Sequence, residues 1–262
     1  MQTNRIDQIF ADDSRELLNV YFTAGYPKLE DTAVILESLA NAGADIIEIG
    51  MPFSDPVADG PTIQESNMQA LENGMNISLL FEQLKGIRNK VDVPIVLMGY
   101  LNPVVQYGIE AFCEKCKEVG IDGLILPDLP MHDYLKNFKD IFDSYSLYNI
   151  FLITPQTSEA RIKEIDENSA GFIYMVSSAS ITGAKKGISE DQEEYFNRIN
   201  ALKLKNPRMI GFGISNRATF LKACEYANGA IIGSAFINLL RDSNDLQNDI
   251  SRFIQEIKGL NN

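Results

Sequence analysis

The sequence is poor in the residues that bind metals or form disulfides. Its 262 residues include one histidine, three cysteines and no tryptophan. Cys113 and Cys116 have the C-x-x-C spacing of redox and zinc sites, but they lie in a helical pattern, AFCEKCKEVG, without the further thiols or histidines that such sites need. We interpret them as a reduced structural pair, predict no metal site, and expect a cytoplasmic protein.

Basic residues are scarce relative to acidic ones. The chain has 23 Lys and Arg against 36 Asp and Glu, a net charge of -13. This balance disfavours nucleic acids and anionic membranes as partners. A small anionic ligand stays compatible with it, because backbone N–H groups and helix N-termini bind phosphate locally.

Long hydrophobic runs are absent as well. No stretch approaches the roughly 18 apolar residues of a membrane span. The first residues, MQTNRIDQIFADD, lack the apolar core of a signal peptide. We therefore expect no membrane insertion and no export.

Eight short apolar runs alternate with amphipathic segments along the chain. Each run is typical of a strand that is buried on both faces, as in parallel sheets. The runs are residues 17–23, 44–50, 93–100, 123–127, 147–154, 171–177, 208–213 and 229–234. Because no linker or low-complexity segment separates them, the pattern predicts an α/β fold, a (β/α)8 TIM barrel that occupies residues 1–262 as a single domain.

A short helical pattern at residues 5–11 precedes the first run. This extra N-terminal helix could close the N-terminal mouth of the barrel. The active site of such a barrel is expected at the other end, where the strands reach their C-termini.

Glu48 lies in the middle of the second apolar run, ADIIEIG. Strand alternation puts it on one face with Ile46, and Ile47 on the other. Burial disfavours the charged carboxylate and raises its pKa, which suits a general acid or base near neutral pH. A structural ion pair with a basic residue of a neighbouring strand is the alternative.

Two aspartates follow this run in a loop with three prolines, PFSDPVADGP. Asp55 and Asp59 would both lie over the barrel mouth near Glu48. Two carboxyl groups in different environments are a recurring arrangement for proton transfer. Either residue could instead serve a turn or a helix cap, and spacing alone does not choose between them.

A loop of small residues, 177–187, follows the sixth run and ends before Ser189, which has Gln192 three residues later. The loop is typical of a lid, and the Ser–Gln pair is typical of a helix capping box. Tyr174, on the preceding strand, could reach inward to a ligand or simply belong to the core.

Glycine-rich turns follow the last two runs, in IGFGISN and IIGSAF. Gly213, Gly233 and Ser234 would let backbone N–H groups approach a phosphate, aided by a helix N-terminus. Barrels of this type often bind phosphate there. Turn geometry alone is the alternative explanation of these glycines.

The segment IEIGMPFSDPVADGP closely resembles the signature of the tryptophan synthase alpha subunit family. Six further motifs resemble the family in order and spacing: FTAGYP, NPVVQYG, PDLP, SITG, GFGIS and IIGSAF. The resemblance implies retro-aldol cleavage of indole-3-glycerol phosphate into indole and glyceraldehyde 3-phosphate. In that reaction Glu48 would protonate the indole C3 and then accept the proton of the glycerol 3′-hydroxyl, while Asp59 would stabilise the protonated ring nitrogen.

The resemblance also implies the substrate contacts and the partner. The implied substrate-binding residues are Phe22 for the indole, Tyr174, and, in the lid and phosphate site, Thr182, Gly183, Gly213, Gly233 and Ser234. Asp55 is left with a structural or interfacial role. The family implies no cofactor in this chain, and an alpha2beta2 tetramer with a beta subunit that carries pyridoxal phosphate. That partner would dock near Asn102 and Pro103.

The chain departs from the family pattern at a few positions, among them Ser178 and Ser180 of the lid. These changes put the closing of the lid and its coupling to a partner in doubt. Three other functions are weighed: a stand-alone indole-3-glycerol phosphate lyase, another phosphate-binding barrel isomerase or epimerase, and a non-catalytic regulatory partner. The last two do not need both Glu48 and Asp59.

Overall fold

The computed structural model describes residues 4–11, 15–56, 59–177, 189–211 and 213–260. Its strands form one parallel sheet. They are β1 (Leu17–Thr23), β2 (Ile46–Gly50), β3 (Ile95–Met98), β4 (Gly123–Ile125), β5 (Tyr148–Asn149), β6 (Leu152–Ile153), β7 (Ile173–Val176), β8 (Arg208–Gly211) and β9 (Gly229–Ile232). Every predicted apolar run contains a strand.

The sheet curls into a barrel. Its strand order is β5-β4-β3-β2-β1-β9-β8-β7-β6. The two ends of this order, β5 and β6, are halves of the fifth predicted strand, interrupted at Ile150 and Phe151. Ile150 N–H donates to Leu124 O on β4 (2.8 Å), whereas Phe151 O accepts from Tyr174 N–H on β7 (3.0 Å). The predicted (β/α)8 barrel is therefore confirmed, with its fifth strand divided between two neighbours.

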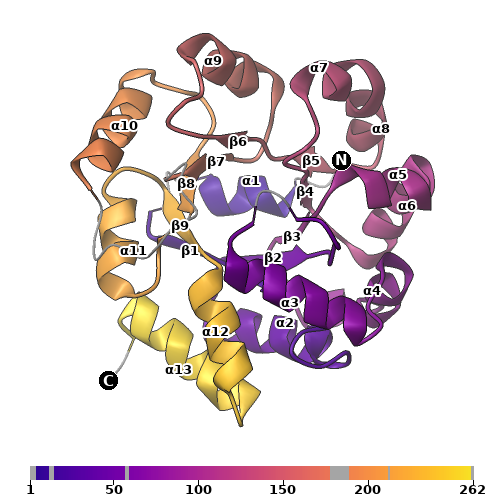
Figure 1. The fold of residues 1–262 in the computed structure, drawn as a ribbon. Coiled ribbons are helices and arrows are strands. Elements are labelled where there is room, and N and C mark those ends of the chain that lie inside the picture. Colours follow the sequence, from indigo (N-terminus) through magenta and orange to yellow (C-terminus); the bar gives the residue numbers. More distant parts are fainter. Residues whose placement is uncertain (1–3, 12–14, 57–58, 178–188, 212, 261–262) are drawn as a thin grey trace.

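Helices surround the ring of strands, and the first of them lies across its middle (Figure 1). They are α1 (Arg5–Phe10), α2 (Asp31–Ala42), α3 (Pro61–Glu72), α4 (Ile77–Gln83), η1 (Ile87–Asn89), α5 (Leu101–Tyr107), α6 (Ile109–Val119), α7 (Met131–Asp133), η2 (Tyr134–Phe138), α8 (Lys139–Ser144), α9 (Glu159–Asn168), α10 (Glu190–Ala201), α11 (Arg217–Cys224), α12 (Ser234–Asp242) and α13 (Leu246–Lys258). The predicted capping box starts α10: Ser189 N–H donates to Gln192 Oε1 (2.8 Å), and Gln192 N–H donates to Ser189 Oγ (3.4 Å). In the described part of the chain, no helix is long and apolar enough to cross a membrane.

Helix α1 lies across the barrel axis, as Figure 1 shows. Its N-cap residue, Asn4, donates to Asp122 O (2.9 Å) and Ser146 O (3.1 Å), which lie just before β4 and β5. Ile6 is fully buried inside the barrel. The predicted N-terminal helix is thus confirmed, and it closes the N-terminal mouth.

The apolar core has two layers. The larger one lies between the strands and the outer helices. The smaller one, called here the interior cluster, fills the barrel and consists of Ile6, Leu17, Ile46, Val96, Ile125, Ile150, Phe172, Tyr174, Val176, Met209 and Ile231. Polar buried side chains such as Asn19 and Glu48 also point into the barrel. The interior therefore changes from apolar at the α1 end to partly polar at the other.

Candidate active site

Glu48 points into the barrel from the middle of β2. It follows Ile46 of the interior cluster by two residues, and its side chain is 1 % exposed. Asn19 of β1 donates from Nδ2 to Glu48 Oε2 (3.0 Å). Within the described residues, Glu48 Oε1 has no hydrogen-bond partner and no basic side chain forms an ion pair with this carboxylate. The structural ion pair weighed from the sequence is therefore not found.

The environment of Glu48 favours its protonated form. Burial raises the pKa of this carboxyl group to about 8, against the opposing hydrogen bond from Asn19 and with a further contribution from the charge of Asp59. A group with this pKa is mostly protonated at pH 7 but ionises readily. It can both donate and accept a proton near neutral pH.

Asp59 lies at the C-terminal end of the barrel, just before α3. Its backbone is held by Gln64 Nε2, which donates to Asp59 O (2.9 Å). The hydroxyl of Tyr100, between β3 and α5, donates to Asp59 Oδ2 at 3.5 Å. Burial raises the pKa of Asp59 to about 6, with the Tyr100 hydrogen bond acting in the opposite direction. The group is therefore mostly ionised at pH 7.

Asp55 differs from Asp59 in its surroundings. It is exposed, and its carboxylate accepts a hydrogen bond from the neighbouring Ser54 hydroxyl (2.6 Å). Glu48 is influenced by the charge of Asp59. Of the two loop aspartates that spacing alone did not separate, Asp59 is the one that shares an electrostatic environment with Glu48.

Two buried tyrosines, Tyr21 and Tyr174, complete the polar end of the barrel. Each ring lies over a glycine of the next strand: a Cβ atom at Gly50 would overlap the Tyr21 hydroxyl, and one at Gly211 would overlap that of Tyr174. Burial raises the pKa of both phenols, and the negative charges of Asp59 and Glu48 raise it further. Both hydroxyls therefore stay neutral hydrogen-bonding groups beside the carboxyl groups.

Phe22, predicted to contact the indole, lies on the other face of β1 from the residues beside Glu48. Asn19 contacts Glu48, and the Tyr21 hydroxyl lies 3.3 Å from Thr23 Oγ1, so these alternate residues of β1 share the inner face. Phe22 lies on the opposite face, fully buried in the layer under the helices. Tyr21, its neighbour, is the aromatic residue of β1 on the inner face, and the contact of Phe22 with the indole stays a prediction.

Three residues near the carboxyl groups were missed by the sequence reasoning: Asn19, Tyr21 and Tyr100. Period-two alternation along LLNVYFT would have found the first two, since an asparagine in an apolar strand is itself unusual. Tyr100 lies just after β3, a position that does not mark it as a site residue. No local sequence pattern indicates that it contacts Asp59. Only the assembled barrel brings them together.

The predicted phosphate-binding turns lie at the ends of β8 and β9. Gly213 is exposed and has a φ of 77°, a conformation that favours glycine. Gly233 is the N-cap of α12, and Ser234 is the exposed first residue of that helix. The N–H groups in the first turn of α12 have no partner within the helix and can bind an anion. Thr182 and Gly183, and the lid positions 178–187 around them, lie outside the described residues.

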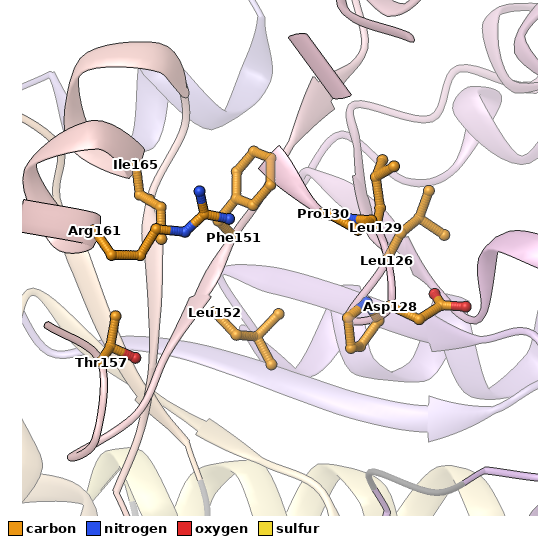
Figure 2. A pocket seen from close by; sticks show the side chains of 10 residues that line it. Leu126, Asp128, Leu129, Pro130, Phe151, Leu152, Thr157, Arg161 and Ile165 are labelled. Carbon is orange, nitrogen blue, oxygen red and sulfur yellow. The ribbon is translucent and has the colours of Figure 1, made fainter. Parts of the chain in front are cut away.

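A separate hollow lies between the loop after β4 and the segment from β6 to α9. Figure 2 shows Arg161 of α9 extending toward the Phe151 ring on one side of this hollow, with the residues of the loop after β4 on the other. Its lining residues are Leu126, Pro127, Asp128, Leu129, Pro130, Phe151, Leu152, Thr157, Arg161 and Ile165. It follows the C-terminal ends of β4 and β6, and none of the predicted site residues that the structure describes lines it.

Comparison with known proteins agrees with this arrangement. The family model described as tryptophan synthase alpha chain matches residues 9–262. The tryptophan synthase alpha chains of Christiangramia forsetii and Flavobacterium psychrophilum are each 57% identical to this chain, over 98% and 97% of it and 99% of their own lengths. A Mycobacterium tuberculosis tryptophan synthase structure matches with a TM-score of 0.88, 30% identity and 98% coverage of both chains. A Legionella pneumophila tryptophan synthase alpha subunit structure matches with a TM-score of 0.87, 30% identity and the same coverage. The chain belongs to the tryptophan synthase alpha chain family.

Proposed function

We propose that Glu48 and Asp59 are the catalytic carboxyl groups of this chain. As a member of its family, the chain is a carbon–carbon lyase that cleaves indole-3-glycerol phosphate into indole and glyceraldehyde 3-phosphate. One observation carries the assignment of the two residues: both carboxyl groups are desolvated at the same end of the barrel, and burial raises the pKa of Glu48 further (about 8) than that of Asp59 (about 6). Such a pair supplies one acid and one anion in the same site at pH 7.

The proposed reaction returns Glu48 to its starting state. Protonated Glu48 donates its proton to C3 of the indole ring, which places positive charge on the ring system. The ionised Glu48 then accepts the proton of the glycerol 3′-hydroxyl as the carbon–carbon bond breaks, giving indole and the aldehyde. Ionised Asp59 stabilises the positive charge at the ring nitrogen meanwhile.

The substrate is proposed to span the end of the barrel. The indole ring lies near the two carboxyl groups, with Tyr21 and Tyr174 beside it. The phosphate group is bound by backbone N–H groups at Gly213, Gly233 and Ser234, with Thr182 and Gly183 of the lid completing the contacts. Glu48 and Asp59 come from β2 and the loop after it, whereas the N-terminus of α12 follows β9. Because both lie at the same end of the barrel, a substrate can reach the carboxyl groups with its ring and the helix N-terminus with its phosphate.

The alpha chain needs no cofactor of its own. In the family, pyridoxal phosphate belongs to the beta subunit, which we propose as the partner in an alpha2beta2 tetramer. Docking on the loop-bearing face would involve Asn102 and Pro103, which start α5, where Leu101 N–H donates to Asp128 Oδ1 (2.9 Å). We further propose that residues 1–262 form one catalytic domain and that the protein acts in the cytoplasm.

The test is indole release from indole-3-glycerol phosphate by the purified chain, with and without a beta subunit. Wild type should release indole, and a beta subunit should accelerate it. Glu48→Gln and Asp59→Asn should fold normally and lose the activity. Full activity without acceleration by a beta subunit would favour a stand-alone lyase, and folded wild type that releases no indole in either condition would contradict the proposal.

A further inference from the structure

The two oxygens of the Glu48 carboxyl group have different surroundings. Oε2 accepts the hydrogen bond from Asn19 Nδ2 at 3.0 Å. Oε1 is buried and has no partner among the described residues. Oε1 is therefore free to exchange a proton with a ligand, whereas Oε2 already accepts a hydrogen bond.

The fold itself gives no reason for an amide at position 19. Asn19 is fully buried in an otherwise apolar strand, and its Oδ1 atom has no hydrogen-bond partner among the described residues. Burying a polar group without full hydrogen bonding destabilises a protein. The one hydrogen bond that its side chain makes in the described structure goes to Glu48. The amide is thus explained by Glu48 and not by strand packing.

We propose that Asn19 is a positioning residue for Glu48, which holds Oε2 and leaves Oε1 as the oxygen that donates and accepts the proton. The proposal rests on the proposed function, in which Glu48 is the acid and base. An oxygen that accepts an N–H from Asn19 is a poor site for the carboxyl proton, so the proton of neutral Glu48 resides on Oε1. After transfer, the same N–H stabilises the negative charge on Oε2 while Oε1 accepts the 3′-hydroxyl proton.

The groups around Glu48 make Asn19 the main stabiliser of its ionised form. The titratable groups that interact with it are Asp59 from the loop after β2, Tyr21 from β1 and Tyr174 from β7. Asp59 raises the pKa of Glu48, as burial does, and the hydrogen bond from Asn19 lowers it. Loss of the amide should therefore shift the titration of Glu48 to higher pH.

Asn149 provides a matched control. It is also a strand asparagine, 1 % exposed, and both polar atoms of its side chain lack partners among the described residues. It lies between Tyr148 and Ile150, which contact the interior cluster, so its side chain faces the helices and not Glu48. Asn19→Leu and Asn149→Leu make the same chemical change at a buried strand position, with and without contact to the carboxyl group.

The first experiment compares the pH dependence of kcat for indole release in these variants. Asn19→Leu should lower kcat about tenfold, the rate equivalent of one hydrogen bond to a charged group, and leave KM nearly unchanged. Its Glu48-dependent limb should move to higher pH. Asn149→Leu should keep the wild-type kcat and profile. If Asn19→Leu fails to fold, Asn19→Ala, which cannot overfill the site, should show the same displacement. An unmoved limb, or an equal displacement in Asn149→Leu, would overturn the proposal.

The second experiment measures the titration of Glu48 without turnover. Carboxyl-labelled glutamate is followed by carbon NMR in the free protein, and the Glu48 signal is identified by its loss in Glu48→Gln. The Asn19→Leu variant should titrate at higher pH than wild type, whereas Asn149→Leu should match wild type. Identical titration in all three would contradict the coupling. A wild type that releases no indole would overturn the proposed function alone, because this titration tests the Asn19 contact separately.

Discussion

The carboxyl groups at the two ends of the barrel differ in the charged and N–H groups that surround them. At the α1 end, Asp122 is 4 % exposed and forms ion pairs with Arg5 and Arg88, and it also accepts from Ile95 N–H (2.8 Å). Asp45, before β2, accepts from Lys258 Nζ (2.7 Å) and Leu18 N–H (2.7 Å). At the other end, Glu48 has one hydrogen bond and no ion pair among the described residues.

This difference separates stabilising carboxylates from reactive ones. The aspartates at the α1 end have their charge matched by cations and N–H donors, which join helices and strands that are distant in sequence. No cation among the described residues pairs with Glu48 or Asp59, and burial raises their pKa values to about 8 and about 6. Unmatched buried groups reduce stability, but they provide the proton affinity that acid–base catalysis near pH 7 requires.

The largest expected effect comes from removing the acid at the reactive end. Glu48→Gln should lower kcat for indole release by about 10³-fold, because a neutral amide cannot transfer the proton. Its midpoint of urea unfolding should not fall, because the buried carboxyl group forms no ion pair with any residue that the structure describes. A variant that keeps more than about a tenth of wild-type kcat would show that Glu48 is not the proton donor.

Removal of the Asp122 carboxylate at the α1 end should lower the free energy of unfolding and leave kcat nearly unchanged. Asp122→Asn leaves Arg5 and Arg88 without their carboxylate, so the free energy of unfolding should fall by about 3 kcal/mol. Urea denaturation followed by circular dichroism measures this loss. At a temperature where the variant is folded, its kcat should stay within about twofold of wild type. A stable variant with greatly reduced kcat would contradict the division between the two ends.

The pH dependence of stability tests the raised pKa of Glu48 without any substitution at the α1 end. The pKa of Glu48 is about 8 in the folded chain and near 4.5 when unfolded, so between these values the folded state binds more protons than the unfolded one. Stability contributed by this group is therefore lost as pH rises through that window, by about 3 to 5 kcal/mol in total. Wild type and Glu48→Gln should unfold with similar free energies near pH 5, and the variant should be the more stable near pH 8. A difference that does not change with pH would contradict the raised pKa.

The smallest effect concerns the hydroxyl that contacts Asp59. Tyr100→Phe removes a long hydrogen bond, 3.5 Å, that lowers the pKa of Asp59. The acidic limb of kcat/KM should move to higher pH, and kcat/KM at pH 6 should fall about two- to fivefold. Tyr107→Phe, at the last residue of α5, where the ring packs against Phe81 and Phe112, is the control and should leave the profile unchanged. An unchanged acidic limb in Tyr100→Phe would remove Tyr100 from the site.

Much of the fold followed from sequence because its signals are local. The apolar runs, the helix before β1 and the Ser189–Gln192 cap each depend on a few neighbouring residues. The division of the fifth strand was not predictable in this way. It arises because β5 bonds to β4 and β6 to β7 when the ring closes, which no feature of LYNIFLIT specifies.

Sequence reasoning singled out a residue where one strand carried the signal by itself. It missed residues whose place in the site depends on contacts between two elements. Glu48 stood out because a carboxylate interrupts an apolar strand. The sequence reasoning named Phe22 and not Tyr21, although Asn19, two residues before Tyr21, already marks the inner face of β1. Spacing alone did not separate Asp55 from Asp59; the family resemblance favoured Asp59, and the folded loop has Asp55 exposed and Asp59 in contact with Tyr100.

The pKa of the Glu48 carboxyl group in the free protein tests the central claim most directly. Carbon NMR of carboxyl-labelled glutamate, with Glu48→Gln to identify the signal, would measure it. The account predicts a titration near pH 8, well above the 4.5 of an unperturbed glutamate. A titration near pH 4.5 would mean that Glu48 is as well stabilised in its charged form as a glutamate in water, and the contrast between the two ends of the barrel would be wrong.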